Sequence, residues 1–208
     1  MRSSVALCAA QILASVLSAQ SDGFVSLIPS KNVREHWVIV ETPPEVWSVD
    51  DGIITCAGQP MGFLRTKKKY KNFIFRADWK FKAEGWTGAP ARWPNAGFFI
   101  FASEDLREKP PRWPRTFVEV QGHYGEAGSV FGGKIQGAKR GPIVKNRIPF
   151  GAWDRYEITA KDGRVRAVLN GELVNEGWGA DPPEGYVCLQ SEGWPVFYRN
   201  VAIKELPE

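Results

Sequence analysis

The chain has 208 residues, of which 43% are hydrophobic and 24% are charged, and its formal net charge is +4. This composition excludes a disordered chain and is typical of one globular domain with a substantial core. The small positive excess argues neither for nor against a nucleic-acid partner. The only dense basic run, residues 67–69, falls in an expected turn between strands, so nucleic acid is set aside.

Residues 1–20 have the layout of a secretory signal peptide. One positive charge at Arg2 is followed by an apolar run from Val5 to Leu17 and then by small residues. The run is too short and too polar to span a bilayer, and the alternative is a buried N-terminal helix. Cleavage near residues 18–21 predicts a secreted or periplasmic protein with a single domain over residues 21–208. Because Cys8 lies inside the apolar run, no lipid anchor is expected.

Period-two patterns dominate the rest of the chain. Residues 73–82 place five apolar side chains on one face and mostly charged side chains on the other, which predicts a half-buried strand with a solvated back. Residues 95–102 are apolar on both faces after Asn95, which predicts a central strand covered on both sides. Two-residue turns are expected at Asp51-Gly52, Asp162-Gly163 and Asn170-Gly171. Many short strands joined by tight turns predict an all-β sandwich of two antiparallel sheets.

Two long segments rich in Pro, Gly and Trp, residues 84–94 and 104–114, interrupt this pattern. They contain Trp86, Trp93 and Trp113, which lie outside any strand pattern. Loop indoles either stack on sugar rings in a cleft or cap the ends of the core. The sequence leaves both interpretations open.

The expected strand at residues 117–123 has an unusual polar side. Val118, Val120 and Gly122 share one face. The opposite face presents a carboxylate, an amide and an imidazole in a row, from Glu119, Gln121 and His123. This row is either a solvated sheet face or the floor of a site.

Six ordered motifs together carry a resemblance to a known family. They are WSVDDGIITCAG, FLRTKKKYKNFIFRADWKF, NAGFFIF, FVEVQ, GAWDRYEITAKDGRVRAVLNGELV and GYVCLQSEGWPVFYRNVAIKEL. In order and spacing they resemble the 3-keto-disaccharide hydrolase domain family over about residues 46–206. The resemblance implies a concanavalin A-like jelly-roll β-sandwich from secreted or periplasmic proteins of carbohydrate-degrading bacteria. It also implies cleavage or hydration of sugars oxidised at C3.

The resemblance implies a site as well as a fold. The family motif matches at Asn95 and Gly97, at Arg65, and at Glu119, Gln121 and Gln190. Two positions depart from it: many relatives carry Asp where this chain has Gly122 and His123, and many carry His in place of Glu192. These departures weaken a catalytic role inferred at either position.

A 3-keto sugar requires particular groups for cleavage. The ketone acidifies the hydrogen on C2, so a base can remove it and the group on C1 can leave, with an enolate to be stabilised on the way. Glu119 is the first expected base and His123 the second, with Arg65 or Lys134 stabilising the enolate oxygen. Substrate contacts are expected from Gln121, Asn95, Lys134, Gln190, Glu192, Trp86, Trp93 and Trp113.

Two other functions remain open for the same carbohydrate ligand. Glu119 and Glu192 can instead form the carboxylate pair of ordinary glycoside hydrolysis. The chain can also be a carbohydrate-binding module of the same fold without turnover.

Metal and cysteine chemistry are only weakly indicated. No paired His or Cys residues occur at the spacing of a zinc site, so no metal ligands are predicted. Calcium stays open as a cofactor, since oxygen-rich loops such as residues 48–51 could coordinate it, although the aspartates there also suit a turn. Cys56 and Cys188 can form a disulfide or remain two buried thiols.

Overall fold

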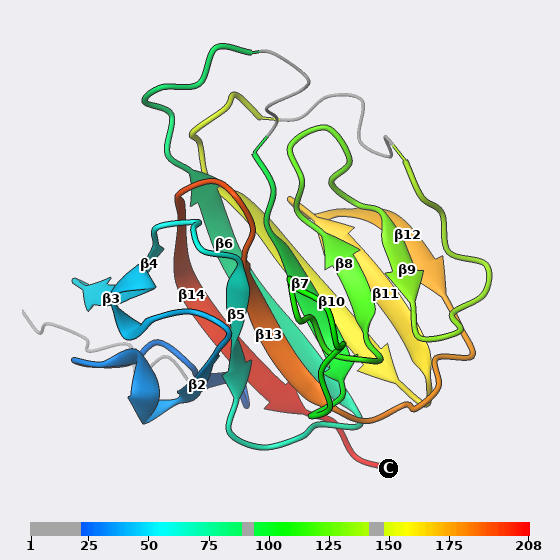
Figure 1. Cartoon of the computed structure of the whole chain (residues 1–208). Coiled ribbons are helices and arrows are strands. Elements are labelled where there is room, and N and C mark those ends of the chain that lie inside the picture. The colour runs from blue at the N-terminus through cyan, green and yellow to red at the C-terminus, as the bar shows by residue number, and fades with distance from the viewer. Residues whose placement is uncertain (1–21, 89–93, 142–147) are drawn as a thin grey trace, which may run out of the picture.

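The computed structural model describes residues 22–88, 94–141 and 148–208, which form two antiparallel β-sheets (Figure 1). The expected signal peptide lies outside the described residues. The larger sheet has eight strands. In spatial order these are β12 (Glu172–Gly177), β11 (Arg164–Leu169), β10 (Asp154–Lys161), β6 (Phe73–Phe81), β14 (Val196–Glu205), β4 (Ile53–Cys56) and β3 (Trp47–Asp50), and β1 (Val25–Ser26) also pairs with β14.

The smaller sheet has six strands and packs against the larger one. Its order is β2 (Trp37–Val40), β5 (Gly62–Thr66), β13 (Tyr186–Ser191), β7 (Gly97–Ala102), β8 (Val118–Gln121) and β9 (Val130–Gly132). The only helical elements among the described residues are two 3₁₀ turns, η1 (Val33–Glu35) and η2 (Pro44–Val46). The predicted all-β sandwich of two antiparallel sheets is confirmed.

Alternation along the strands builds the core between the sheets. In β6 the predicted apolar face is buried at every position, from Phe73 to Phe81. On the facing sheet Val118 and Val120 of β8 are fully buried in the same core. Because side chains alternate across a strand, this packing turns Glu119 and Gln121 to the outer face of the six-stranded sheet.

The three predicted tight turns are confirmed. Asp51-Gly52 joins β3 to β4, Asp162-Gly163 joins β10 to β11, and Asn170-Gly171 joins β11 to β12. Both residues of each pair have positive φ, for example 44° at Asp51 and 72° at Gly52. Such angles match the twist of a two-residue hairpin, and Asp-Gly and Asn-Gly pairs tolerate them best.

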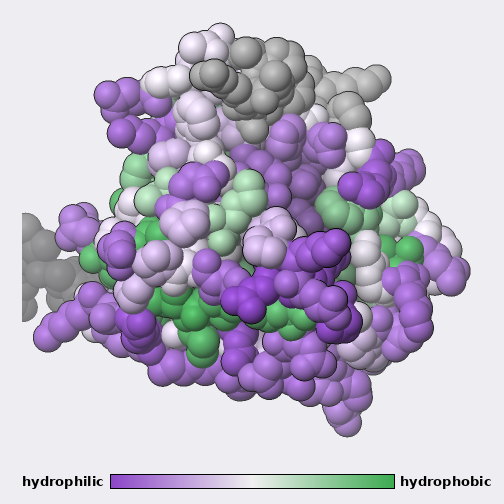
Figure 2. Space-filling model, viewed as in Figure 1, coloured by the Kyte–Doolittle hydropathy of each residue, from purple (hydrophilic) through white to green (hydrophobic). Residues whose placement is uncertain are grey.

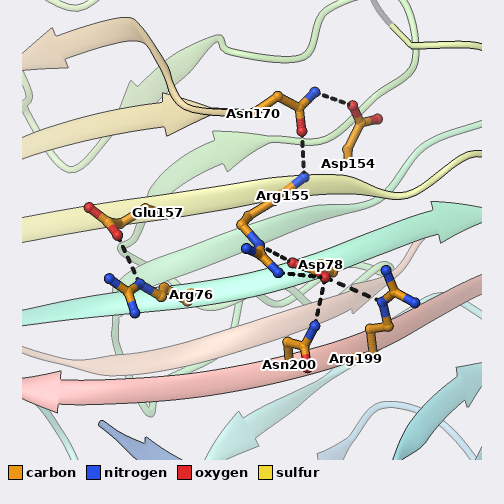
Figure 3. A network of polar contacts seen from close by, with 8 residues as sticks. All are labelled: Arg76, Asp78, Asp154, Arg155, Glu157, Asn170, Arg199 and Asn200. Atoms are coloured by element: carbon orange, nitrogen blue, oxygen red, sulfur yellow. Dashed lines mark hydrogen bonds and ion pairs between the residues drawn. The ribbon is translucent and has the colours of Figure 1, made fainter. Parts of the chain in front are cut away.

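The outer face of the eight-stranded sheet holds a buried carboxylate (Figure 3). Asp78 on β6 accepts hydrogen bonds from Arg155 on β10, at 2.5 and 3.1 Å. It also accepts bonds from Arg199 at 3.3 Å and Asn200 at 2.8 Å. The predicted solvated back of β6 is therefore wrong at this position, because side chains from two neighbouring strands cover Asp78.

The outer face of the six-stranded sheet is partly covered by its own connection. All six residues of β7 are buried, and β7 lies between β13 and β8, so the prediction of a central strand covered on both sides is confirmed. On the outer side the cover is a small second cluster that includes Phe63, Phe99, Trp113 and Phe117. The segment that connects β7 to β8 supplies Trp113.

Cys56 and Cys188 are both buried free thiols. Cys56 lies in the core between the sheets, whereas Cys188 lies in the outer cluster. Of the two alternatives left open by the sequence, the structure has the separate thiols. Within the described parts of the chain, no helix is long and apolar enough to cross a membrane.

Candidate functional site

The site centres on the outer face of the six-stranded sheet, where three neighbouring strands align polar side chains. The register pairs Gly97 of β7 with Gln121 of β8, and Phe99 with Glu119. On the other side of β7, Leu189 pairs with Phe98, which brings Gln190 of β13 beside Gly97. Two amides and one carboxylate thus surround a residue that has no side chain.

Gly97 makes this convergence possible. A Cβ atom added there would lie 2.6 Å from Oε1 of Gln190, 3.0 Å from Oε1 of Glu119 and 3.3 Å from Oε1 of Gln121. These separations are shorter than ordinary carbon–oxygen contacts. The missing side chain therefore leaves the space into which the three polar groups point.

Glu119 is a buried carboxyl group, with 6% of the residue exposed. Burial raises its pKa from 4.5 to about 7 because the charged form loses its hydration. A hydrogen bond with Gln190 and the charges of Arg140 and Arg107 lower the pKa, but burial outweighs them. A carboxyl group with a pKa near 7 can take up and release a proton at neutral pH.

Glu192 supplies a second carboxyl group next to the first. It follows the end of β13, and its backbone forms an isolated bridge with Asn95. Burial raises the pKa of Glu192 to about 8, and the charge of Glu119 raises it further. Because the charge of one carboxyl group changes the pKa of the other, Glu119 and Glu192 titrate as a coupled pair with separated pKa values.

Several buried polar atoms at this end of the sheet have no hydrogen-bond partner within the described residues. They are Oε1 of Gln190, Oε2 of Glu192, Oδ1 of Asn95 and Nε1 of Trp86. Buried polar groups are nearly always paired, so a group of unpaired ones indicates a place for a polar ligand. Figure 2, which views this face, shows hydrophilic residues set back between projecting ones in its upper half.

His123 lies just beyond the end of β8 and is half-buried. Its backbone N–H donates to Oε1 of Gln121 at 2.9 Å, and its Nδ1 accepts the N–H of Gly125 at 3.2 Å. The His123 imidazole thus helps to shape the turn after β8, and its backbone fixes the orientation of the Gln121 amide.

Arg65 and Lys134, the two expected oxyanion groups, form ion pairs away from Glu119. Arg65 occupies the same row as Glu119 but three strand spacings away, about 14 Å. It pairs with Glu104 at 2.8 Å and lies over the ring of Tyr186. Lys134 is exposed and pairs with Asp181. The structure does not bring either residue to the carboxylates.

The three loop tryptophans have different surroundings. Trp113 is 9% exposed, and its ring centroid lies 6.1 Å from that of Phe63 and 5.5 Å from that of Phe99. The indole therefore covers the outer sheet face. Trp86 stacks on Phe150 at 4.0 Å and meets Tyr124 edge-on. Trp93 lies outside the described residues. Of the two visible indoles, Trp86 is the one with an unpaired buried N–H.

Two arginines that the sequence analysis missed flank Glu119. Arg107 lies over the ring of Phe117, with 5.1 Å to its centroid, and Arg140 lies over the ring of Phe131 at 4.0 Å. Phe117 precedes Glu119 by two residues on the same face, and Phe131 is the cross-strand partner of Glu119. The concentration of basic residues at 107–115 was the available signal for Arg107.

Two buried tyrosines of the opposite sheet hold the strands that carry the amides. Tyr156 donates its hydroxyl hydrogen to the backbone oxygen of Gln121 at 2.6 Å, and Tyr198 donates to that of Gln190 at 2.9 Å. These bonds cross the sandwich core. They fix the positions of the two site strands relative to the larger sheet.

No metal centre is evident in the described part of the chain. It contains no group of three or more His, Cys, Asp or Glu side chains that could hold a metal ion. At residues 48–51, the oxygen-rich loop considered for calcium, Asp50 ends β3 and Asp51 begins the hairpin turn.

The fold and the site define a concanavalin A-like jelly-roll sandwich with one buried and one half-buried carboxyl group on the outer face of one sheet. The model of the family described as "3-keto-alpha-glucoside-1,2-lyase-like domain" matches residues 23–204. The chain belongs to this family, as the sequence motifs predicted. No curated protein matches the chain.

Solved structures agree on the architecture. A protein from Parabacteroides distasonis ATCC 8503, provisionally described as a glycosyl hydrolase, is 26% identical with a TM-score of 0.62, covering 89% of this chain and 94% of its own. A second protein from that organism, with the same description, is 20% identical with a TM-score of 0.64, covering 88% and 99%. The carbohydrate-binding module CBM66 from Bacillus subtilis is 14% identical with a TM-score of 0.58, covering 82% and 96%.

Proposed function

We propose that this protein cleaves 3-keto-glycosides by elimination across C1 and C2. The observation that carries the proposal is the pair formed by the buried carboxyl group of Glu119 and the half-buried one of Glu192, whose pKa values are raised to about 7 and about 8. Membership of the 3-keto-alpha-glucoside-1,2-lyase-like family supports this substrate class. Perturbed carboxyl groups in a polar site are typical of proton-transfer catalysis.

The reaction needs no oxidant or reductant. The ketone at C3 acidifies the hydrogen on C2, and a base removes it as a proton. The electron pair of the C2–H bond forms the enolate, and its collapse makes the C1–C2 double bond as the C1–O bond breaks. The departing oxygen takes a proton, so the products are an alcohol and an unsaturated 3-keto sugar. Addition of water to that double bond completes net hydrolysis.

The two carboxyl groups suit opposite roles in this scheme. At pH 7 a group with a pKa of about 7 is half ionised, so Glu119 can act as the base at C2. Glu192, with a pKa of about 8, is still mostly protonated and can donate to the departing oxygen. A pair whose environments separate its pKa values divides the acid and base roles in this way.

Amide groups around the pair are suited to position the sugar. Oε1 of Gln190 and Oδ1 of Asn95 can accept hydrogen bonds from sugar hydroxyls, since they have no partner among the described residues. The Gln121 oxygen is occupied by the His123 backbone, which directs the Gln121 –NH₂ group elsewhere. We assign that –NH₂ group to the enolate oxygen, where it replaces Arg65 and Lys134 of the sequence-based scheme.

A carbohydrate-binding module without turnover is the second candidate. The fold shared with CBM66 favours it. A binding module needs amides and aromatic surfaces but gains nothing from carboxyl groups that are costly to ionise. The raised pKa values of Glu119 and Glu192 therefore favour the enzyme.

The test is turnover of a 3-keto-glucoside or 3-keto-trehalose by the purified protein, with the unoxidised parent sugar as the control substrate. Release of the C1 group and the absorbance of the unsaturated ketone are followed together. We expect turnover of the oxidised substrate only, and a loss of about 10²- to 10⁴-fold in the Glu119→Gln variant. Binding of the keto sugar by wild type without any product would overturn the enzyme and support the module.

A further inference from the structure

A pocket separate from the carboxylate site lies on the same sheet face, inside the segment that connects β7 to β8. Its volume is about 640 Å³. Figure 1 shows this segment folded over the lower ends of the two strands. The pocket is lined by Arg107, Glu108, Lys109, Pro110, Pro111, Trp113 and Arg115.

The lining of this pocket is cationic and not neutralised. Three positive side chains, Arg107, Lys109 and Arg115, face one negative side chain, Glu108. None of the three cations forms an ion pair with any residue that the structure describes. Two other arginines on this side of the molecule do form ion pairs: Arg65 pairs with Glu104 at 2.8 Å, and Arg112 pairs with Glu41 at 2.7 Å. Three cations without an ion-pair partner among the described residues thus line one pocket.

The pocket is built into an ordered segment. The backbone N–H of Arg107 donates to the backbone oxygen of Trp113 at 2.9 Å, and the backbone N–H of Arg115 donates to the backbone oxygen of Asp105 at 2.7 Å. Leu106 and Pro114 form an antiparallel bridge between these two bonds. The indole of Trp113 packs on Phe63 and Phe99 of the sheet beneath. Hydrogen bonds and packing thus hold the backbone that carries these cations in place without a ligand.

The pocket adjoins the carboxylate site. Arg107 lies over the ring of Phe117, and Phe117 is two residues from Glu119 on the same face, about 7 Å along the strand. The charge of Arg107 also lowers the pKa of Glu119, which indicates that the two groups are close. A sugar unit bound at Glu119 would extend its next unit or substituent toward the cations.

We propose that this pocket binds an anionic group of the carbohydrate, either the carboxylate of a uronic acid or a sulfate ester. Both anions are planar or tetrahedral oxygen clusters that guanidinium groups bind by paired hydrogen bonds. The assignment of the anion to a unit next to the one cleaved rests on the proposed function. Binding of the anion itself does not.

Binding measurements on a matched pair of variants test the proposal. The pocket variant is Lys109→Gln with Arg115→Gln, which leaves Arg107 beside Glu119 unchanged. The control is Lys161→Gln with Arg166→Gln, which removes the same two residue types from exposed positions on the eight-stranded sheet. The ligands are oligogalacturonate for the carboxylate, chondroitin sulfate oligosaccharide for the sulfate, and a malto-oligosaccharide as the neutral reference.

Calorimetry with these ligands is expected to separate the two variants. Wild type and the control should bind an anionic ligand with the same affinity, and the pocket variant should bind it about tenfold more weakly, since each exposed ion pair contributes a few-fold. The ligand for which the control and the pocket variant differ in affinity identifies the bound group as a carboxylate or a sulfate. Equal loss in both variants would reduce the effect to general charge and overturn the proposal, as would wild-type affinity for the neutral ligand equal to that for the anions.

The same variants keep this proposal separate from the proposed function. If no 3-keto substrate is turned over but the pocket variant alone loses anion binding, the enzyme assignment fails and the pocket survives. If 3-keto-glucoside is cleaved and the pocket variant binds anions as the control does, the pocket fails and the enzyme survives. Repeating the binding in the Glu119→Gln background removes any contribution of turnover.

Discussion

Two carboxylates on opposite faces of the sandwich have similar burial and opposite chemistry. Asp78 on the eight-stranded sheet is 3% exposed, and Glu119 on the six-stranded sheet is 6% exposed. Burial alone raises the pKa of either group, yet the pKa of Asp78 is lowered whereas that of Glu119 is raised to about 7. The difference between the two sites lies in the hydrogen-bond donors around each group.

Asp78 is surrounded by donors that favour its charged form. Arg155, Arg199 and Asn200 direct side-chain N–H groups at its oxygens (Figure 3). At Glu119, Arg107 and Arg140 lie over phenylalanine rings instead, and among the described residues the Gln190 amide bonds the carboxyl group. A buried acid with enough donors stabilises the structure, while one without them is available for proton transfer.

The largest expected effect is on turnover, which should depend on the carboxyl group of Glu119 and not on that of Asp78. Glu119→Gln should lower turnover of a 3-keto-glucoside by about 10³-fold, because the base is lost while the shape of the side chain is kept. Asp78→Asn is the matched change on the other sheet and should leave turnover close to wild type. Steady-state kinetics at a temperature where both variants are folded make the comparison. Equal losses in the two variants would mean that Glu119 acts through stability.

The next largest effect is on stability, and here the change at Asp78 should cost more than the change at Glu119. Asp78→Ala should lower the free energy of unfolding by about 3 kcal/mol, because it removes hydrogen bonds from charged and neutral donors to a buried carboxylate. Urea denaturation at pH 7 measures it. Glu119→Gln serves as the control and should not destabilise the protein at this pH. A cost below about 1 kcal/mol for Asp78→Ala would show that its partners contribute little.

The pH dependence of stability should differ in sign between the two sites. Glu119 and Glu192 bind protons more tightly in the folded state, so the free energy of unfolding should fall as pH rises from about 4.5 through about 7 and about 8. At about 1.4 kcal/mol per pKa unit, we expect a loss on the order of 3 to 5 kcal/mol per carboxyl group. Asp78, with its lowered pKa, contributes stability that is lost only on acidification below its ordinary value.

Denaturation curves from about pH 2 to about pH 9 test this expectation with the same two variants, since the Asp78 contribution is lost only below its ordinary pKa. Glu119→Gln should flatten the alkaline decline, and Asp78→Asn should flatten the acid decline. An alkaline decline of the same size in Glu119→Gln would mean that its carboxyl group ionises without cost in the folded protein.

A smaller effect should follow from filling the space at Gly97. Gly97→Ala places a Cβ atom 2.6 Å from the Gln190 oxygen, so the Gln190 and Glu119 side chains must move. We expect kcat/KM to fall about tenfold, as for a modest displacement of a positioned catalytic group. Stability should change by less than about 1 kcal/mol, because alanine favours the strand more than glycine does. Unchanged kinetics would remove Gly97 from the site.

The smallest effect concerns the bonds that cross the core. Tyr198→Phe removes the hydroxyl group that donates to the Gln190 backbone oxygen, and it should cost about 1 kcal/mol in thermal or urea denaturation. Tyr156→Phe removes the corresponding bond to Gln121 and should cost at least as much, because the Tyr156 oxygen also accepts the Gly128 N–H. Costs near zero for both would show that packing alone holds the site strands.

Prediction from sequence succeeded where the signal was local. The alternation in residues 73–82 identified the buried face of β6, and the Asp-Gly and Asn-Gly pairs located three hairpins. The same alternation placed Glu119 and Gln121 together on one face of β8. It did not decide whether that face was solvated, because the answer depends on chain segments that cover it from elsewhere.

The pairing of charged groups was the part that sequence reasoning missed. Arg65 pairs with Glu104, 39 residues away, and Asp78 pairs with Arg155, 77 residues away. Arg107 and Arg140 approach Glu119 from two different connections, on either side of β8. Long flexible side chains choose partners by distance in the folded protein, which no local pattern records.

The sequence by itself determined the all-β architecture, the tight turns and the faces on which apolar and polar side chains alternate, since these follow from backbone geometry over a few residues. Only the tertiary structure decided that Asp78 accepts hydrogen bonds from two arginines and an asparagine, whereas Glu119 is buried beside the half-buried Glu192 and bonds the amide of Gln190. The physical reason is that burial and charge pairing depend on contacts between strands distant in the chain, and those contacts set which carboxyl groups can exchange protons near neutral pH.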